Sequence, residues 1–370
     1  MPKLKIVKYT PAMFDRIFEQ VSKLRSDYPL RFRGFVDAYY ASSEFCQLNV
    51  ALDEQGEVAG LKGVEWMPFE DQGKKLKLGV GSNFYAFRPG AGAYLLMNSL
   101  RSCDAALVFG GSRDMNNMIT KAGWRYFTGV KSMLLNRRIS PDPKDGALKG
   151  LVKKFLKHAP FRQALTSLAN RLPSCVRDVT VAEVDCITDD LLDFKSAFGF
   201  RFAPDREYLA WRYGPEVPYL RHRTFRVARN GWHLGYAVLL DKGEQVVVAH
   251  ADGSEPAALA AGIVKAISAI ARNTRDFREV LLTSAHPAMQ QLFKGVGFVT
   301  RPQWNRPFAL GGLKGGFDIV TPVSEWMVNH GWGDNALRPP FVEKPAVTTV
   351  RTSSRAHEGH IHAARMSRRP

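Results

Sequence analysis

The spacing of apolar positions predicts a first α/β unit in the N-terminal part of the chain. Alternating or continuous apolar runs predict its strands, at 3–9, 46–52, 58–66, 76–87, 105–109 and 127–135. Apolar residues three and four positions apart predict its helices, at 11–24, 93–100 and 112–123. The last of these helices is bounded by residues with suitable capping chemistry, Ser112 at its start and Gly123 at its end.

The same order of elements returns in the C-terminal part. Apolar runs predict strands at 176–184, 225–228, 234–240, 245–249, 280–283 and from 297 onward. Helical spacing predicts helices at 189–198, 256–271 and 287–294. The two units share their order of elements and little of their residue identity. This pattern indicates a duplicated architecture.

Residues 141–146, a cluster of Pro, Asp and Gly, separate the two units. Apolar residues then recur at helical spacing over 148–172, with lysines between them. We expect a helical connector packed on the two units. The alternative is a basic amphipathic segment that lies on an anionic membrane. The predicted divisions are 1–140, a linker at 141–174, 175–335, and a disordered basic tail at 336–370.

Composition and charge narrow the class of protein. The chain has 370 residues, 45% of them hydrophobic, and a formal net charge of +17, which favours anionic ligands. Its first residues form no apolar signal core, and the longest apolar stretch, 257–271, contains Lys265. We therefore expect a cytoplasmic protein without a spanning helix. The four cysteines have no C-x-x-C spacing, so we expect neither a zinc site nor a disulfide framework.

A glycine-rich turn between a strand and a helix is the strongest chemical motif. The segment Arg88-Pro89-Gly90-Ala91-Gly92-Ala93-Tyr94 follows the strand at 76–87 and precedes the helix at 93–100. Such a turn points backbone N–H groups outward, and the helix N-terminus adds positive potential, so together they can hold a pyrophosphate. We expect a side chain at Gly92 to occupy the space of that ligand.

With the strand, helix and Gly-Trp pair that follow, residues 76–126 resemble the central motif of the GNAT superfamily of acyl-CoA N-acyltransferases. Residues 286–298, which end in Gly297-Phe298, resemble its last helix and Gly-Phe pair. The resemblance implies two tandem GNAT-like domains of mixed α/β sheet, and acetyl-CoA or another acyl-CoA as cofactor. Ile119 replaces the tyrosine that often acts as general acid in the family. Residues 251–255 lack the glycine motif and carry acidic groups, so we expect the second domain to bind no cofactor.

The resemblance also implies a set of site residues. We expect the acyl carbonyl to meet a backbone N–H near Val80. The cofactor is expected to contact Arg88, Gly90, Ala91, Gly92, Ala93, Tyr94 and Asn116. Glu65, between Val64 and Trp66, is the first candidate for a general base, with a surface glutamate as the alternative. Tyr126 is a candidate acid, with a packing role as the alternative.

Three functions remain open from the sequence. The first is acyl transfer to an amine or hydroxyl of a small metabolite, such as a sugar or amino sugar. Residues 208–213 and 332–334 are similar to segments of two-domain GNAT proteins of bacterial polysaccharide assembly. The second is FemABX-like aminoacyl transfer from tRNA, although we expect no nucleic-acid partner because the connector is short. The third is a non-catalytic acyl-CoA-binding protein.

Overall fold

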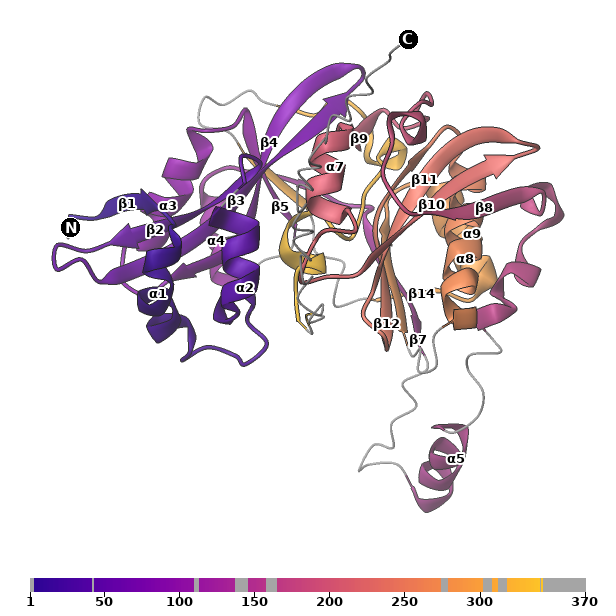
Figure 1. Cartoon of the computed structure of the whole chain (residues 1–370), viewed down its shortest axis with the longest axis horizontal. Coiled ribbons are helices and arrows are strands. Elements are labelled where there is room, and N and C mark those ends of the chain that lie inside the picture. Colours follow the sequence, from indigo (N-terminus) through magenta and orange to yellow (C-terminus); the bar gives the residue numbers. More distant parts are fainter. Residues whose placement is uncertain are drawn as a thin grey trace, which may run out of the picture.

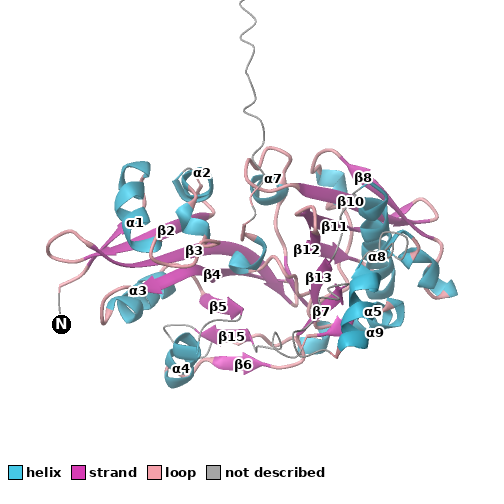
Figure 2. Cartoon of the chain, turned by 90° about the horizontal axis from the view of Figure 1, so that it is seen from below, coloured by secondary structure: helices cyan, strands magenta, loops and turns pink. Residues whose placement is uncertain are grey.

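The computed structural model describes residues 3–41, 43–109, 113–136, 146–157, 165–273, 279–301, 308–311, 318–339 and 341. These residues form two mixed β-sheets that lie side by side, with helices on their faces (Figures 1 and 2). The predicted α/β class with two units is therefore confirmed. The predicted tail beyond Phe341 lies outside the described residues.

The first sheet has the strand order β1-β2-β3-β4-β5-β15-β6, and β9 pairs with β3 beside it. Its strands are β1 (Lys5–Lys8), β2 (Cys46–Leu52), β3 (Val58–Asp71), β4 (Lys74–Ala86), β5 (Ala105–Phe109), β6 (Arg125–Phe127), β9 (Phe200–Phe202) and β15 (Phe308–Gly311). Figure 2 shows two helices on one face, α1 (Phe14–Val21) and α2 (Arg33–Val36). The helices on the other face are α3 (Ala91–Leu100) and α4 (Arg113–Lys121), which pack together through apolar side chains.

The second sheet has the order β14-β7-β13-β12-β11-β10-β8. Its strands are β7 (Lys131–Asn136), β8 (Val179–Val184), β10 (His222–Arg229), β11 (Trp232–Asp241), β12 (Gln245–Gly253), β13 (Glu279–Ser284) and β14 (Val299–Thr300). Two helices cover its outer face, α8 (Pro256–Asn273) and α9 (Pro287–Val296). A further helix, α7 (Arg206–Tyr213), lies between the two sheets (Figure 1).

The two sheets exchange strands. The single strand predicted at 127–135 is wrong: β6 stays in the first sheet, whereas β7 pairs with β13 in the second. In return, β15 enters the first sheet between β5 and β6. An ideal Cβ on Gly311 would lie 2.3 Å from the Trp124 ring, so only glycine lets β15 pass this close to the Gly-Trp pair. The sheets are therefore not built from two separate halves of the chain.

Residues 189–198 also differ from their predicted structure, a helix. Within residues 189–198 the structure has one short 3-10 turn, Asp189–Leu191, and no helix of greater length. Tertiary hydrogen bonds hold the rest in an irregular path, because Ala197 N–H donates to Gly253 O and Gly199 N–H donates to Glu325 O. Ser196 also donates to Asp252. Long-range partners thus override the local helical pattern.

The hydrophobic core continues across the boundary between the sheets. One buried cluster joins side chains of the first sheet, such as Phe69 and Val80, to side chains of the second, such as Val238 and Leu281. Trp332 packs edge-on against Phe69, with ring centroids 4.7 Å apart. The two units therefore form one body rather than two independently packed domains.

The helix α5 (Ala147–Lys157) stands apart from both sheets (Figure 1). Its Leu148 and Leu151 side chains are 81% and 67% exposed. The expected packing of this part of the connector on the two units is therefore not found. No helix in the described part of the chain is long and apolar enough to cross a membrane.

Candidate active site

The strands β4 and β5 separate halfway along the first sheet. Their parallel pairing covers Leu78–Ala105, Gly79–Ala106 and Val80–Leu107, and ends there. Beyond Val80, β4 continues to Ala86 with its other edge paired to β3. Within the described residues, the separation leaves the β5-facing edge of β4 without a strand partner from Gly81 onward. Val80 itself is buried at the start of this opening.

A β-bulge lies on β4 at the same point. Asn83 has a left-handed backbone, with φ of 48°, and the register with β3 shifts next to it. Its amide nitrogen donates to the Tyr40 hydroxyl at 2.8 Å, and that hydroxyl lies 3.1 Å from Ser82 Oγ. Asn83 Oδ1 is buried and has no hydrogen-bond partner in the part of the chain that the structure describes. A buried acceptor of this kind fits a ligand that donates an N–H or O–H group.

The loop after β4 ends in Gly90, which caps α3 with φ of 82°. Within the described residues, the amide N–H groups of Gly90, Gly92 and Ala93 make no hydrogen bond. Arg88 fixes the loop from the other side: its backbone N–H donates to Ala59 O, and its guanidinium lies 2.8 Å from Asp53. The loop thus presents free amides at a positive helix end, as an anion site requires.

The structure changes the role expected of Gly92. An ideal Cβ there would lie 3.4 Å from Phe84 Cζ and 3.5 Å from Ala86 Cβ, on the side of β4. It would therefore pack inside the fold and would not enter the space in front of the amides. Ala91 is buried, whereas Ala93 and Tyr94 are exposed at the outer side of the first turn of α3.

The two polar residues predicted beyond β5 lie close to each other. Tyr126 on β6 donates from its hydroxyl to Asn116 O at 3.0 Å and lies 2.7 Å from Thr120 Oγ1. Asn116 is half-buried on α4. Ile119, at the family's tyrosine position, is fully buried between α3 and α4. No hydroxyl is therefore available from position 119.

Glu65 lies in a buried polar network. Its side chain is 1% exposed, so Glu65 is not a surface glutamate. Tyr39 donates to Oε2 at 2.7 Å, Tyr208 donates to Oε1, and Arg212 forms an ion pair with Oε2. Arg212 in turn donates to Gly331 O and Gly333 O at 2.6 and 3.0 Å. Because three donors already occupy the carboxylate, its geometry suits an anchor between the two units better than a base.

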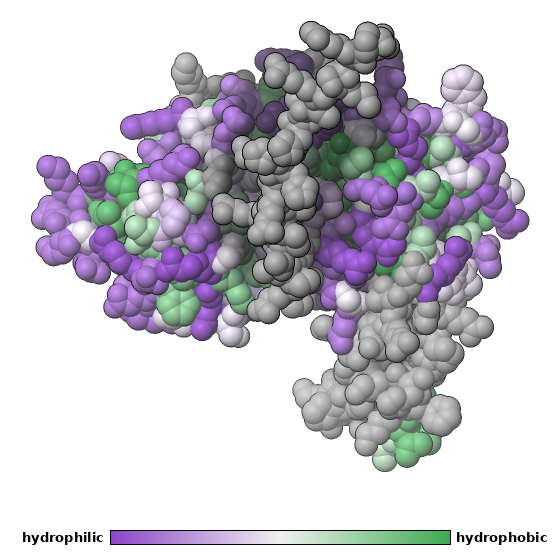
Figure 3. Space-filling model, viewed as in Figure 1, coloured by the Kyte–Doolittle hydropathy of each residue, from purple (hydrophilic) through white to green (hydrophobic). Residues whose placement is uncertain are grey.

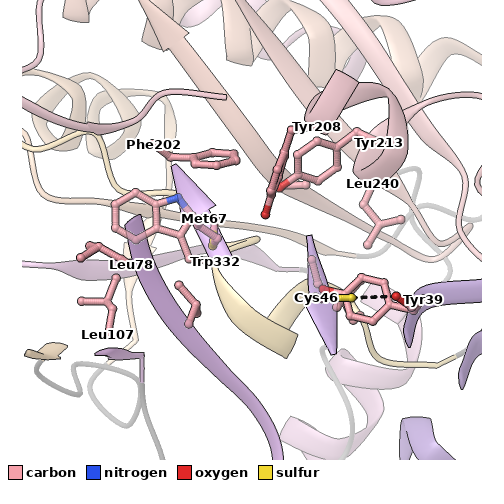
Figure 4. Close-up of a cluster of buried hydrophobic side chains, with 14 of the residues drawn as sticks. Tyr39, Cys46, Met67, Leu78, Leu107, Phe202, Tyr208, Tyr213, Leu240 and Trp332 are labelled. Atoms are coloured by element: carbon pink, nitrogen blue, oxygen red, sulfur yellow. Dashed lines mark hydrogen bonds between the residues drawn. The ribbon is translucent and has the colours of Figure 1, made fainter. Parts of the chain in front are cut away.

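Figure 4 shows part of this network inside the shared core. Tyr208 and Tyr213 approach from α7, and Tyr39 accepts a hydrogen bond from Cys46 Sγ through its backbone oxygen at 2.7 Å. Burial raises the pKa of Tyr39 and Tyr208 well above the usual tyrosine value, so both hydroxyls stay protonated as donors. Removal of either hydroxyl would leave Glu65 or Arg212 with an unmet hydrogen bond.

Lys62 was not singled out from the sequence. It lies on β3 with 3% exposure, and its amine makes no hydrogen bond or ion pair within the described residues. Its Cε lies 3.6 Å from the position of a Cβ on Gly81, and its Nζ is 5.7 Å from the centre of the Phe84 ring. Burial lowers the pKa of this amine to about 8. The only signal in the sequence is a lysine inside an apolar strand.

The second sheet has a matching separation between β12 and β13, but the chain itself fills it. Pairing ends at Val247–Leu281. Beyond that point Gly331 N–H donates to Ala249 O at 2.9 Å, and the Asn329 side chain bonds both backbone groups of Ala251. His330 Nδ1 lies 3.0 Å from Thr283 Oγ1 on β13. Residues 329–331 therefore close this opening; we call them the plug.

The acidic loop of the second unit, residues 251–255, is also held by internal contacts. Asp252 is buried and forms an ion pair with Arg201 at 2.7 Å. Arg201 also contacts Glu70 of the first unit at 2.9 Å. This carboxylate holds the two units together, and no pyrophosphate could share its position.

The two predicted catalytic residues do not come together. Glu65 lies on β3 and Tyr126 on β6, with β4, β5 and β15 between them. Four strand spacings correspond to roughly 19 Å. A single reaction centre cannot use both. Among the described residues, no group of three or more His, Cys, Asp or Glu side chains could hold a metal ion.

Several solved structures share this architecture. A tandem GNAT protein from the clavulanic acid biosynthesis pathway, solved without AcCoA, aligns over 84% of this chain and 98% of its own, with TM-score 0.50 and 11% identity. A Pyrococcus horikoshii protein proposed to be an acetyltransferase aligns over 90% and 95%, with TM-score 0.51 and 12% identity. A conserved protein of unknown function from Enterococcus faecalis V583 aligns over 84% and 72%, with TM-score 0.50 and 9% identity.

These similarities confirm the tandem GNAT fold for this chain. No protein-family model and no curated protein sequence matches it. The likeness to proteins of polysaccharide assembly and the division at 1–140, 141–174, 175–335 and 336–370 stay predictions.

Proposed function

We propose that this protein is an acyl-CoA-dependent acyltransferase with one active site, in the first unit. The observation that supports it is the contrast between the two openings. The first has a bulged strand edge and, among the described residues, free amides at Gly90, Gly92 and Ala93, whereas the plug closes the second. The acyl group would pass to an amine or hydroxyl of a small acceptor, such as a sugar or amino sugar.

Each part of the site has a role in this proposal. The amides of Gly90, Gly92 and Ala93 would hold the pyrophosphate of acetyl-CoA or another acyl-CoA, with Arg88, Tyr94 and Asn116 beside it. The edge of β4 past Val80 would hold the thioester, where a backbone N–H polarises the carbonyl. An unpaired acceptor at Asn83 Oδ1 would receive the N–H or O–H of the acceptor molecule.

Proton transfer then needs a base that is not already occupied. Lys62 meets this need better than Glu65, because its amine has no partner in the described residues and its pKa falls to about 8. The acceptor nitrogen or oxygen attacks the thioester carbon, the C–S bond breaks, and the thiolate leaves as a thiol once protonated. The ammonium that Lys62 forms, rather than Tyr126, can return its proton to the thiolate, because Tyr126 on β6 lies as many strands from Lys62 as from Glu65.

Acetyl-CoA titration of two matched variants tests the cofactor site. Ala93→Asp places a carboxylate in the exposed first turn of α3, where it stabilises the helix but repels a pyrophosphate. Ala257→Asp is the corresponding change in the first turn of α8 in the second unit, where the side chain is half-buried. Calorimetry should show acetyl-CoA affinity at least about tenfold weaker in Ala93→Asp, with an unchanged melting temperature, and normal affinity in Ala257→Asp.

The same titration separates the alternatives. Equal loss of affinity in both variants, or no loss in Ala93→Asp, would reject the single-site assignment. Binding of tRNA without acetyl-CoA would favour the FemABX-like function, although the described part of the connector, α5, is only 11 residues long. Cofactor binding without release of CoA in the presence of any amine or sugar would favour a non-catalytic binding protein.

A further inference from the structure

The helix α5 carries an apolar surface that nothing in the described part of the molecule covers. Leu148, Leu151 and Val152 are 81%, 67% and 49% exposed. They are three and four positions apart, so they lie on one side of the helix. Figure 3 shows apolar surface at the end of the molecule where α5 lies in Figure 1. Exposed leucines clustered in this way indicate an interaction site.

Positive charge accompanies this surface. The helix contains Lys149, Lys153, Lys154 and Lys157 and no acidic residue. An apolar stripe combined with an excess of lysine is the pattern of a helix that lies in the plane of an anionic bilayer surface.

We propose that α5 docks the protein on the surface of an anionic lipid membrane. The leucine and valine side chains would enter the boundary between headgroups and acyl chains. The lysines would stay at the level of the phosphates, where their long stems can reach water. No helix of the described part spans a membrane, so this contact would be peripheral and reversible.

The chemistry of the surface favours a bilayer over other partners. A polynucleotide would neutralise the lysines but would leave Leu148 and Leu151 in water. A second copy of the chain has the same net charge of +17, which opposes pairing of two such helices. Only a partner that is both apolar and anionic matches both properties of α5. Docking through α5 is independent of acyl transfer.

Vesicle co-sedimentation of the full chain tests this proposal. Vesicles of phosphatidylcholine with and without phosphatidylglycerol supply the charge comparison. The double variant Leu148→Glu/Leu151→Glu removes the apolar surface, and Trp232→Glu is the matched control because Trp232 is 79% exposed on a hairpin of the second sheet. We expect wild type and Trp232→Glu to bind only the anionic vesicles, and the double variant to bind at least about tenfold more weakly.

Three results would overturn the proposal. One is equal binding by the double variant, and another is equal loss in Trp232→Glu. The third is no binding by wild type at low salt. A second variant, Lys153→Glu/Lys154→Glu, should lose the preference for phosphatidylglycerol. An unchanged preference for phosphatidylglycerol in this variant would contradict the role proposed for the lysines. Circular dichroism and melting temperature on all variants would show whether the fold is kept.

Discussion

Lys62 shows how a single residue connects the site to stability. Its pKa falls from 10.5 to about 8 because the charged amine is buried. Between these two values the unfolded chain binds a proton that the folded chain does not, so the free energy of unfolding rises with pH in this window. The rise amounts to about 3 kcal/mol at most.

Lys62→Met should therefore raise the free energy of unfolding at pH 7 by up to about 3 kcal/mol and should remove this part of the pH dependence. Urea unfolding at pH 7 and pH 10 measures both effects. Lys242 is the matched comparison, since burial lowers its pKa to about 8 as well, but its amine donates to Arg338 O at 2.6 Å. A Lys62→Met protein that is less stable than wild type at pH 7 would contradict this account.

Single residues also show which features of the site could not be predicted from the sequence. The apolar neighbours of Glu65 indicated an unusual carboxylate, and burial confirms that much. Its partners could not be foreseen, because Tyr208 and Arg212 lie more than 140 positions away along the chain. A buried ion pair depends on the fold that surrounds it, and no local pattern encodes that fold.

At the scale of elements, the prediction was best where one segment makes its own structure. The strand at 46–52 and the helix ending at Leu100 are found as expected, and Gly90 and Gly123 both adopt the positive φ that a turn requires. The helix predicted over 189–198 is wrong because its backbone bonds to distant residues. The strand β15 has only four residues, too few for a pattern.

The plug of the second opening offers a test at this scale. A Cβ on Gly331 would lie 2.3 Å from Ala249 O, a backbone atom that cannot move freely. Gly331→Ala should therefore lower the free energy of unfolding by about 3 kcal/mol. Gly295→Ala is the control, because nothing lies within 4 Å of its Cβ position and α9 should gain from alanine. Equal urea midpoints for both variants would show that residues 329–331 do not hold the opening closed.

Folding of the whole molecule depends on the exchange of strands between the two sheets. A fragment of residues 1–140 would contain β5 and β6 without β15 between them, and would carry β7 without its partner β13. We expect this fragment to aggregate when expressed alone, and to become soluble when residues 141–370 are co-expressed. Size-exclusion chromatography measures both. A monomeric 1–140 fragment with cooperative unfolding would show that the first sheet is complete without β15.

The late position of β15 in the chain also determines when the first sheet can be completed during synthesis. The ribosome completes β6 roughly 180 residues before it delivers β15. At ordinary elongation rates this interval lasts on the order of ten to forty seconds. During that time β5 and β6 have open edges next to a growing chain, and an identical nascent chain on the same messenger could supply the missing strand. The exchange that joins the two finished sheets thus leaves the newborn chain open to pairing with its neighbours until β15 is made.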